Sequence, residues 1–409
     1  MPTLRLYQTD RYLRENTARV TAVTESGGFD SIACDASVFY PLGGGQPSDT
    51  GTVALGDNVY RVTAASDRSL ESDVWHQTDA PAGTFHEGDE VTLTIDWDVR
   101  FRNMQRHLGE HMLSGVMYNL FNGTNKGFHM GEEFITIDID LGGRMLTDEE
   151  LLLAERTVNE AVWADLPVTV SCFDDYESSL ALPVRKQVPH EGKVFVVTVG
   201  DPGDPLDCIA CCGTHPKSSA EVGLVAIYKC DPNKGMNRVY FDCGRMAKDR
   251  LSSDSRLLAE VAKRYSCSSK DLLSRLDTEA ENTAALRARL AMMSSYVRDA
   301  ECAKILSEID AADSNVYTYS SDILSNDDLL KLGFSVIGET EGKVLLMMQP
   351  ESLTCIMFSS GDIKCGQYIK EHAKEHNGRG GGRDDNARAI FQSAHDMRAF
   401  ATEAAKVLQ

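Results

Sequence analysis

The first 95 residues alternate apolar and polar positions in short runs, which is the pattern of half-buried β-strands. Gly, Asp, Asn and Pro separate the runs and favour turns between them. Short strands of this kind close most naturally into a small antiparallel barrel. The clearest runs cover residues 19–26, 32–34, 58–63 and 90–96.

From residue 96 to 247 helical and strand periods are mixed, which indicates an α+β domain. His107 and His111 lie four residues apart and open the apolar face of an amphipathic helix, so both imidazoles point the same way. Thr147 and Glu150 form a capping-box pattern that begins a second helix. Strands are expected at 134–140, 168–171, 194–199 and 238–242.

The stretch between Gly244 and Gly333 contains no glycine or proline, and we predict helices over 257–265 and 270–309. Apolar positions in the second helix alternate spacings of three and four, which favours a spacer or dimer helix without chemistry. The seam residues are Thr283, Leu286, Leu290, Met293, Val297 and Ala300.

Residues 312–409 are expected to hold strands at 335–338 and 344–348 and an alanine-rich helix from Asp396. With 409 residues the chain is too long for one hydrophobic core. We predict an α+β protein with a glycine-rich barrel at 1–95, a metal-binding domain at 96–247, a helical linker at 248–311 and a C-terminal α/β domain at 312–409.

The opening residues lack the apolar core of a signal peptide, and no run approaches the roughly 20 apolar residues of a membrane span. Eleven cysteines in a long chain fit free thiols in a reducing compartment. A cytoplasmic protein without a membrane partner is therefore expected.

The formal net charge of −21 means that any contact with nucleic acid must be a local basic patch, since nucleic-acid-binding surfaces are usually basic. Residues 370–409 hold seven Lys or Arg and six Asp or Glu, a net charge of +1. This part of the chain is therefore the least acidic candidate for a contact with nucleic acid. DNA is not an expected partner.

Two histidine and cysteine motifs share one spacing. His107 and His111 are matched by Cys211 and His215, again four apart, and together they offer a full tetrahedral ligand set for zinc. Cys212 leaves the register open by one residue, although the four-residue spacing to His215 favours Cys211.

Two other interpretations compete for these residues. Residues 107–111 match H-x-x-E-H, the inverzincin protease signature, in which Glu110 would be the general base. Cys208 and Cys211 have the spacing of a redox or zinc-knuckle pair. Neither explains the Cys211–His215 spacing or the glycine run at 43–45.

Glycines mark two further candidate binding segments. Gly43, Gly44 and Gly45 offer backbone N–H groups and permit close approach of a ligand or another chain. Around 378–382 glycines are interleaved with Arg379 and Arg383, with Arg388 beyond, and could cradle phosphate.

In this order the motifs resemble those of the long-form alanyl-tRNA editing proteins, AlaX, and of the editing and C-terminal parts of alanyl-tRNA synthetase. The resemblance covers essentially the whole chain. It implies an editing domain like that of threonyl-tRNA synthetase, with four zinc ligands, seven contacts to tRNA or substrate and a C-terminal domain that captures tRNA(Ala). The ligands would be His107, His111, Cys211 and His215, and the contacts Gly43, Gly44, Gly45, Gln46, Thr214, Arg379 and Arg383.

The resemblance implies a cytoplasmic hydrolase that deacylates mischarged tRNA(Ala), chiefly Ser-tRNA(Ala), without aminoacylation. A zinc-stabilised tRNA-binding adaptor without catalysis stays open, as does a homodimer through the helical linker or the C-terminal domain. The family often has Glu at Leu42, Thr at Leu108 and Gln at Glu110, so these departures bear on substrate contacts. Glu110 remains the one named candidate for a proton acceptor, although it points about 100° away from His111 on the helix.

Overall fold

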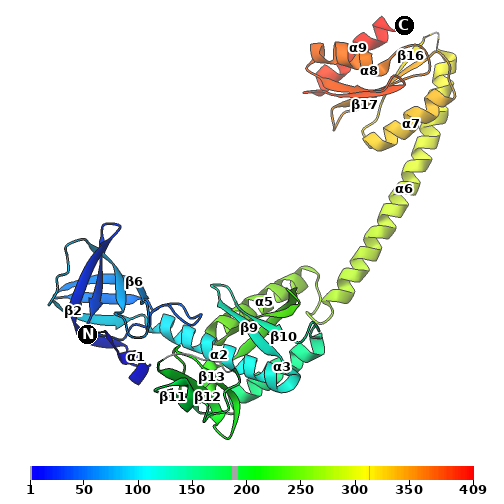
Figure 1. The fold of residues 1–409 in the computed structure, drawn as a ribbon. Coiled ribbons are helices and arrows are strands. Elements are labelled where there is room, and N and C mark those ends of the chain that lie inside the picture. Colours follow the sequence, from blue (N-terminus) through cyan, green and yellow to red (C-terminus); the bar gives the residue numbers. More distant parts are fainter. Residues whose placement is uncertain (1, 187–191, 313) are drawn as a thin grey trace. The chain divides into compact units, whose positions relative to one another are not determined.

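A computed structural model describes residues 2–186, 192–312 and 314–409, and its mixed α+β architecture agrees with the expected class. The chain divides into two compact units, one ending at Glu260 and the other beginning at Val261. Each is described by itself (Figure 1).

Six antiparallel strands at the start of the chain close into a barrel in the order β2-β3-β7-β6-β5-β8 (Figure 1). Buried and exposed positions alternate along β7 and β8, so one side chain in two enters the barrel core. The predicted barrel is confirmed. Its strands are β2 (Glu15–Ser26), β3 (Phe29–Cys34), β5 (Gly51–Leu55), β6 (Asn58–Ser66), β7 (Trp75–Pro81) and β8 (Glu90–Ile95).

Before and beside the barrel lie two-residue strands, β1 (Leu4–Arg5) and β4 (Ala36–Ser37), which pair in parallel, and the one-turn helix α1 (Leu6–Thr9).

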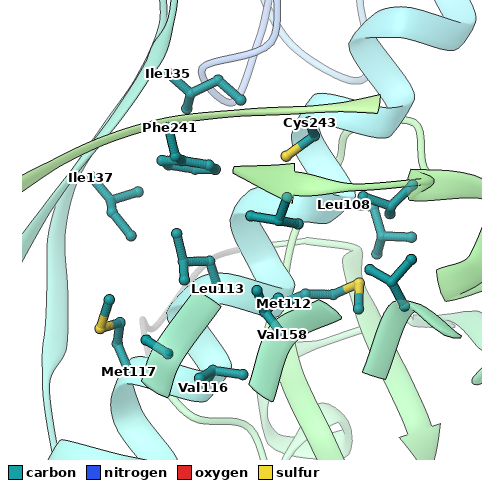
Figure 2. Packing of buried hydrophobic residues seen from close by; sticks show 14 of the residues in the cluster. Leu108, Met112, Leu113, Val116, Met117, Ile135, Ile137, Val158, Phe241 and Cys243 are labelled. Carbon is teal, nitrogen blue, oxygen red and sulfur yellow. The ribbon is translucent and has the colours of Figure 1, made fainter. Parts of the chain in front are cut away.

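Helix α2 (Trp97–Phe121) follows the barrel directly and organises the rest of this unit. Most of it is buried, and α3 (Asp148–Trp163) packs beside it, opened by the predicted capping box at Thr147. Figure 2 shows Leu108, Met112 and Leu113 of α2 meeting Ile137 and Phe241 of the neighbouring sheet. The core therefore fixes which face of α2 is left for the two histidines.

Two sheets surround α2, and both contain strands that the sequence predicts. One has the order β14-β15-β10-β9 and the other β11-β12-β13. The short helix α4 (Tyr176–Ser179) lies between β11 and β12 of one sheet, and the 3₁₀ turn η1 (Ser219–Val222) lies between β13 and β14 and so links the two sheets. The strands are β9 (Thr124–Met130), β10 (Ile135–Asp140), β11 (Val168–Phe173), β12 (Val194–Asp201), β13 (Asp204–Ala210), β14 (Val225–Asn233) and β15 (Met236–Cys243).

Helix α5 (Gly244–Arg264) begins well before the predicted residue 257, since three apolar or small positions, Met246, Ala247 and Leu251, already continue the helical period. Helix α6 (Leu272–Ala311) agrees with the prediction for 270–309.

The C-terminal part is a five-stranded sheet in the order β16-β17-β18-β20-β19. Helix α7 (Asn326–Gly338) and the end of α6 share one hydrophobic cluster with the sheet, and α8 (Cys365–His372) and α9 (Ala394–Val407) share another. A 3₁₀ turn, η2 (Ala373–His376), follows α8. The strands are β16 (Val316–Ser320), β17 (Val344–Gln349), β18 (Thr354–Ser359), β19 (Arg379–Gly382) and β20 (Asn386–Ile390).

The predicted strand at 335–338 is wrong. These residues are the end of α7, which Ser325 caps and which buries Leu329, Leu332 and Val336 at helical spacing. Within the arginine–glycine segment, 379–382 form the edge strand β19 paired with β20, which the sequence pattern did not predict. A Cβ at Gly380 would lie 2.1 Å from a carbonyl oxygen of β20, so glycine is needed for this close pairing.

Among the described residues no helix combines the length and apolar character needed to cross a bilayer.

Candidate metal centre

Four side chains from two distant segments meet at one point. His107 and His111 of α2 and Cys211 and His215, just after β13, place one potential ligand atom each within 4.8 Å of all the others. Cys211 Sγ lies 3.4 Å from His107 Nε2 and 3.6 Å from His215 Nε2. This group could hold a metal ion, and it contains Cys211 rather than the exposed Cys212.

The charges of the group suit a cation. Burial raises the pKa of Cys211, but the three imidazoles outweigh it and hold this pKa well below its usual value, so the thiolate is favoured. Burial lowers the pKa of His215 to about 3, which keeps that imidazole neutral and able to bind a metal. Partial desolvation, together with the nearby Cys211 thiolate, instead raises the pKa of the neighbouring Cys212 to about 11.

Buried polar atoms without hydrogen-bond partners provide a second test of whether this group fits a metal ion. Neither nitrogen of His111, nor Nδ1 of His215, has a hydrogen-bond partner in the described part of the chain. Leaving buried polar atoms unpaired costs about 1–3 kcal/mol each. A metal ion bound by His111 would remove part of that cost, so these residues fit the zinc that the motifs indicate.

Gln46 connects the glycine segment of the barrel to this group. Its Oε1 accepts a hydrogen bond from the backbone N–H of Thr214 at 3.0 Å, and its Nε2 donates to Thr214 Oγ1 at 2.8 Å. Oε1 therefore also accepts from His107 Nδ1–H at 2.8 Å. This bond fixes the tautomer of His107 and leaves Nε2 facing Cys211 with its lone pair.

The glycine run at 43–45 forms part of a tight turn and is not an open loop around a ligand. Gly44 and Gly45 have φ of +57° and +80° and lie between the mutually bonded Gly43 and Gln46. Such a two-residue turn needs positive φ at both central positions. Gly45 also packs so closely on Phe128 that a Cβ would lie 2.6 Å from that ring. The turn thereby directs Gln46 inward to His107.

Close packing also determines the backbone path of the second ligand motif, between Cys211 and His215. A Cβ at Gly213 would lie 2.2 Å from His107 Cε1 and 3.0 Å from Gln46 Oε1. Only glycine lets the segment between Cys211 and His215 pass over the imidazole of His107.

A buried ion pair that sequence reasoning missed anchors the glycine segment to α2. Arg100 and Asp49 are both fully buried and bonded to each other through two guanidinium nitrogens. Arg100 also donates to the Val38 carbonyl at 2.6 Å, and Asp49 accepts from the Tyr40 N–H at 2.7 Å. No spacing signal links residues 49 and 100, so only the fold reveals the pair.

Glu110 is buried on the same helix turn as His111. Its Oε1 accepts from Ser114 Oγ at 2.7 Å and from Asn125 Nδ2 at 2.8 Å, and its Oε2 lies 4.0 Å from His111 Nδ1. Asp207 and Arg185, which sequence reasoning also missed, form a buried pair on the same side of His111.

Two adjoining cavities of about 370 and 890 Å³ border the group from outside. Both are lined by Tyr7, Phe195 and Cys212; the smaller one reaches Thr214 and the larger one Gly43 and Gly44. Leu42 is exposed and lines the larger cavity, whereas Leu108 is fully buried in the core (Figure 2). Of these two departures from the family pattern, only Leu42 can contact a ligand in the cavities.

Two of the C-terminal arginines, Arg383 and Arg388, line a separate groove of about 450 Å³ within the second unit. It is also lined by Gly381 of β19 and by Phe334, which is 46% exposed on α7. In the described part of the chain neither Arg383 nor Arg388 forms an ion pair, so both guanidinium groups are available to a ligand. Arg379 is exposed on the same edge strand.

Two protein families match parts of the chain. Residues 10–99 match the family of class II (A) tRNA synthetases, and residues 194–240 match the second additional domain of threonyl and alanyl tRNA synthetases. The second match contains Cys211 and His215.

Similar proteins cover different shares of the chain. The alanyl-tRNA editing protein AlaX-L of Pyrococcus horikoshii is 26% identical over 95% of both chains. The alanine–tRNA ligase of Pyrococcus abyssi is 32% identical over 63% of this chain but only 28% of the ligase. The alanyl-tRNA editing protein Aarsd1 of Bos taurus is 30% identical over 56% of this chain and 51% of its own. The resemblance that the motifs indicated is thus confirmed: this chain is similar over nearly its whole length to an alanyl-tRNA editing protein of the long form.

Proposed function

We propose that this protein is a trans-editing hydrolase that cleaves the ester of mischarged tRNA(Ala), chiefly Ser-tRNA(Ala), at a zinc-containing site. The observation that carries the proposal is the buried His107–His111–Cys211–His215 group beside cavities that lead to the glycine turn. The relatives named as alanyl-tRNA editing proteins support the same activity.

Different residues of the chain would bind the metal, orient its ligands and line the cavity for the substrate. The four ligands would hold zinc, which supplies positioning of the aminoacyl-adenosine end or polarisation of its carbonyl. Gln46 and Thr214 keep His107 in its metal-binding tautomer. Gly43, Gly44 and Tyr40 line the larger cavity, where the acceptor end would enter.

Selectivity for serine has to come from polar groups, because a pocket that accepts serine cannot exclude the smaller alanine by size. A buried polar group that alanine leaves unpaired costs about 1–3 kcal/mol, or roughly 5- to 150-fold in rate. Two or more such groups are therefore needed for strong discrimination.

A non-catalytic tRNA-binding adaptor is the second candidate. A set of four protein ligands leaves no open position on a tetrahedral zinc, which is typical of structural sites. An inverzincin-type protease is less well supported, because Glu110 accepts hydrogen bonds from Ser114 and Asn125 on the Nδ1 side of His111.

Two finer proposals concern partners. The groove with Arg383 and Arg388, together with Arg379 on the edge strand, would add affinity for the phosphates of tRNA(Ala). The exposed apolar seam of α6 would pair with a second copy of this chain, since its spacing is that of a coiled coil.

The deciding experiment measures initial deacylation rates on Ser-tRNA(Ala) and Ala-tRNA(Ala). We expect rapid loss of serine, little loss of alanine, and no activity in His107→Ala, whereas His86→Ala, with an exposed side chain on the barrel, should match wild type. Equal rates on both substrates would refute editing selectivity. Bound tRNA and zinc without hydrolysis of either ester would favour the adaptor.

Elemental analysis tests the metal. Stoichiometric zinc should be absent from Cys211→Ala and kept in Cys212→Ala, since only Cys211 belongs to the group. The reverse result would move the ligand to Cys212, and retention in both variants would refute this ligand set.

A further inference from the structure

Three buried charged side chains lie behind His111, on the Nδ1 side of its ring. Asp207 Oδ2 is 3.4 Å from Nδ1 and Glu110 Oε2 is 4.0 Å from it. Arg185 pairs with Asp207 in turn. The side chains of Glu110, Asp207 and Arg185 are 7%, 1% and 6% exposed, so these charges act through little water.

Asp207 is held more firmly than an isolated buried carboxylate would be. Arg185 Nε donates to its Oδ1 at 2.6 Å, and the Arg185 backbone N–H bonds to the carbonyl of Cys208, the next residue on β13. Gly115 of α2 makes the approach possible, because a Cβ there would lie 2.4 Å from the Leu206 carbonyl oxygen and 2.9 Å from Asp207 Cβ. His111 and Gly115 thus sit one helical turn apart on the face that β13 crosses.

Glu110 is engaged elsewhere and farther away. Its Oε1 accepts from both Ser114 and Asn125, which also bond to each other at 2.9 Å. Asp207 is therefore the carboxylate that lies nearer to the ring of His111.

We propose that Asp207, held by Arg185, is the positioning residue that orients His111 for metal binding. Its carboxylate favours the tautomer with the proton on Nδ1. That tautomer turns the lone pair of Nε2, a buried atom without a hydrogen-bond partner among the described residues, toward the metal. The proposal rests on the proposed zinc site and extends it to a residue outside the four ligands. Gln46 has the corresponding position at Nδ1 of His107.

The first test is the zinc affinity of full-length Asp207→Asn, measured by competition with a chelating dye. We expect about 10- to 100-fold weaker zinc binding than in wild type. The visible absorption spectrum of the Co²⁺-loaded protein should also change, because a reoriented imidazole alters the ligand field. The exposed Asp204→Asn, on the same strand, is the matched control and should change neither.

Asp207→Asn leaves the Arg185 guanidinium buried without its partner, which by itself can destabilise the fold. Arg185→Met/Asp207→Asn removes both charges and should still bind zinc weakly with the altered Co²⁺ spectrum. Arg185→Met alone keeps the carboxylate beside His111 but removes the bond that holds it, so zinc binding should weaken less than in Asp207→Asn.

The outcomes separate this proposal from the zinc site itself. Recovery of wild-type zinc affinity in the double variant would overturn it, because the weaker binding in Asp207→Asn would then come from the stranded guanidinium. An unchanged affinity and spectrum in Asp207→Asn would overturn it as well. Absence of zinc and Co²⁺ binding in wild type would instead refute the metal centre, whatever the role of Asp207.

Discussion

Single glycines determine whether the metal-binding side chains can converge. Gly213 has no space for a Cβ beside His107 and Gln46, and Gly45 has none beside Phe128. The ring of Phe128 stacks on His107 with centroids 5.5 Å apart. Each of these contacts constrains His107 from a different direction, so the imidazole is held in place before any metal binds.

This packing predicts the effect of Gly213→Ala. Since the added methyl would overlap His107 Cε1 and Nδ1, either the ring or the segment before His215 must move. We expect about tenfold or greater loss of zinc affinity, as for disruption of residues that support a ligand, measured by dye competition. Gly338→Ala, where a Cβ would meet nothing within 4 Å, should bind zinc like wild type. Equal affinities in the two variants would contradict the packing argument.

The barrel carries a buried titratable group that is independent of the metal. His76 on β7 is fully buried, its ring bonded to Ser37 Oγ at 2.7 Å and to the Ile32 carbonyl at 3.1 Å. Burial lowers its pKa to about 4. Between pH 6.5 and 4 the unfolded chain therefore binds a proton that the folded barrel does not, and stability falls as the pH is lowered.

The expected decrease across that window is on the order of 3 kcal/mol. About 2 kcal/mol of this decrease should appear between pH 7 and pH 5, measured as the hydrogen-exchange stability of amides in β3 and β7 in wild type and His76→Gln. The variant should lose less stability on acidification, while His86→Gln, exposed on the same barrel, should follow wild type. An identical pH dependence in wild type and His76→Gln would show that His76 is not the titrating group.

The long helix α6 exposes its apolar seam instead of burying it. Leu286, Leu290 and Met293 are 67%, 65% and 58% exposed. If a second copy covers them, Leu290→Lys/Met293→Lys should convert a dimer into the 44.9 kDa monomer in sedimentation experiments. Met292→Lys changes an equally exposed residue off the seam and should stay dimeric. A monomeric wild type would leave α6 as a spacer.

Sequence patterns predicted elements best where one period dominates. The alternation along β8 and the 3.6-residue period of α2 were sufficient for the barrel and the histidine helix. The pattern failed at 335–338, where four apolar or small residues fit strand and helix equally, and only burial of Leu329, Leu332 and Val336 distinguishes them. The edge strand β19 was missed because glycine has low strand propensity and enters the sheet here for close packing.

At the scale of the whole molecule, local spacing predicted the two ligand pairs. It could not predict the ion pairs that hold the surrounding segments in place. The Arg100–Asp49 and Arg185–Asp207 pairs join residues 51 and 22 positions apart, with no periodic pattern to connect them. Contacts of this kind depend on how the barrel loop, α2 and β13 meet. They become predictable only once the fold is known.

Net charge is also a property of the whole molecule. In a chain of net charge −21, Arg383 and Arg388 line one groove of the C-terminal unit, so they should carry much of the attraction to tRNA phosphates. Arg383→Ala/Arg388→Ala should weaken binding of tRNA(Ala). The slope of log affinity against log salt should become shallower by about 0.9 for each phosphate that is no longer neutralised.

The rate at saturating tRNA should stay at the wild-type value, since this pair lies outside the metal-binding unit. Filter binding over a range of salt concentrations, combined with single-turnover deacylation, separates the two effects. Arg398→Ala, an exposed arginine on α9 that does not line the groove, controls for the removal of a positive charge alone. Unchanged affinity and salt slope in the double variant would assign the groove a role in folding or assembly and not in tRNA capture.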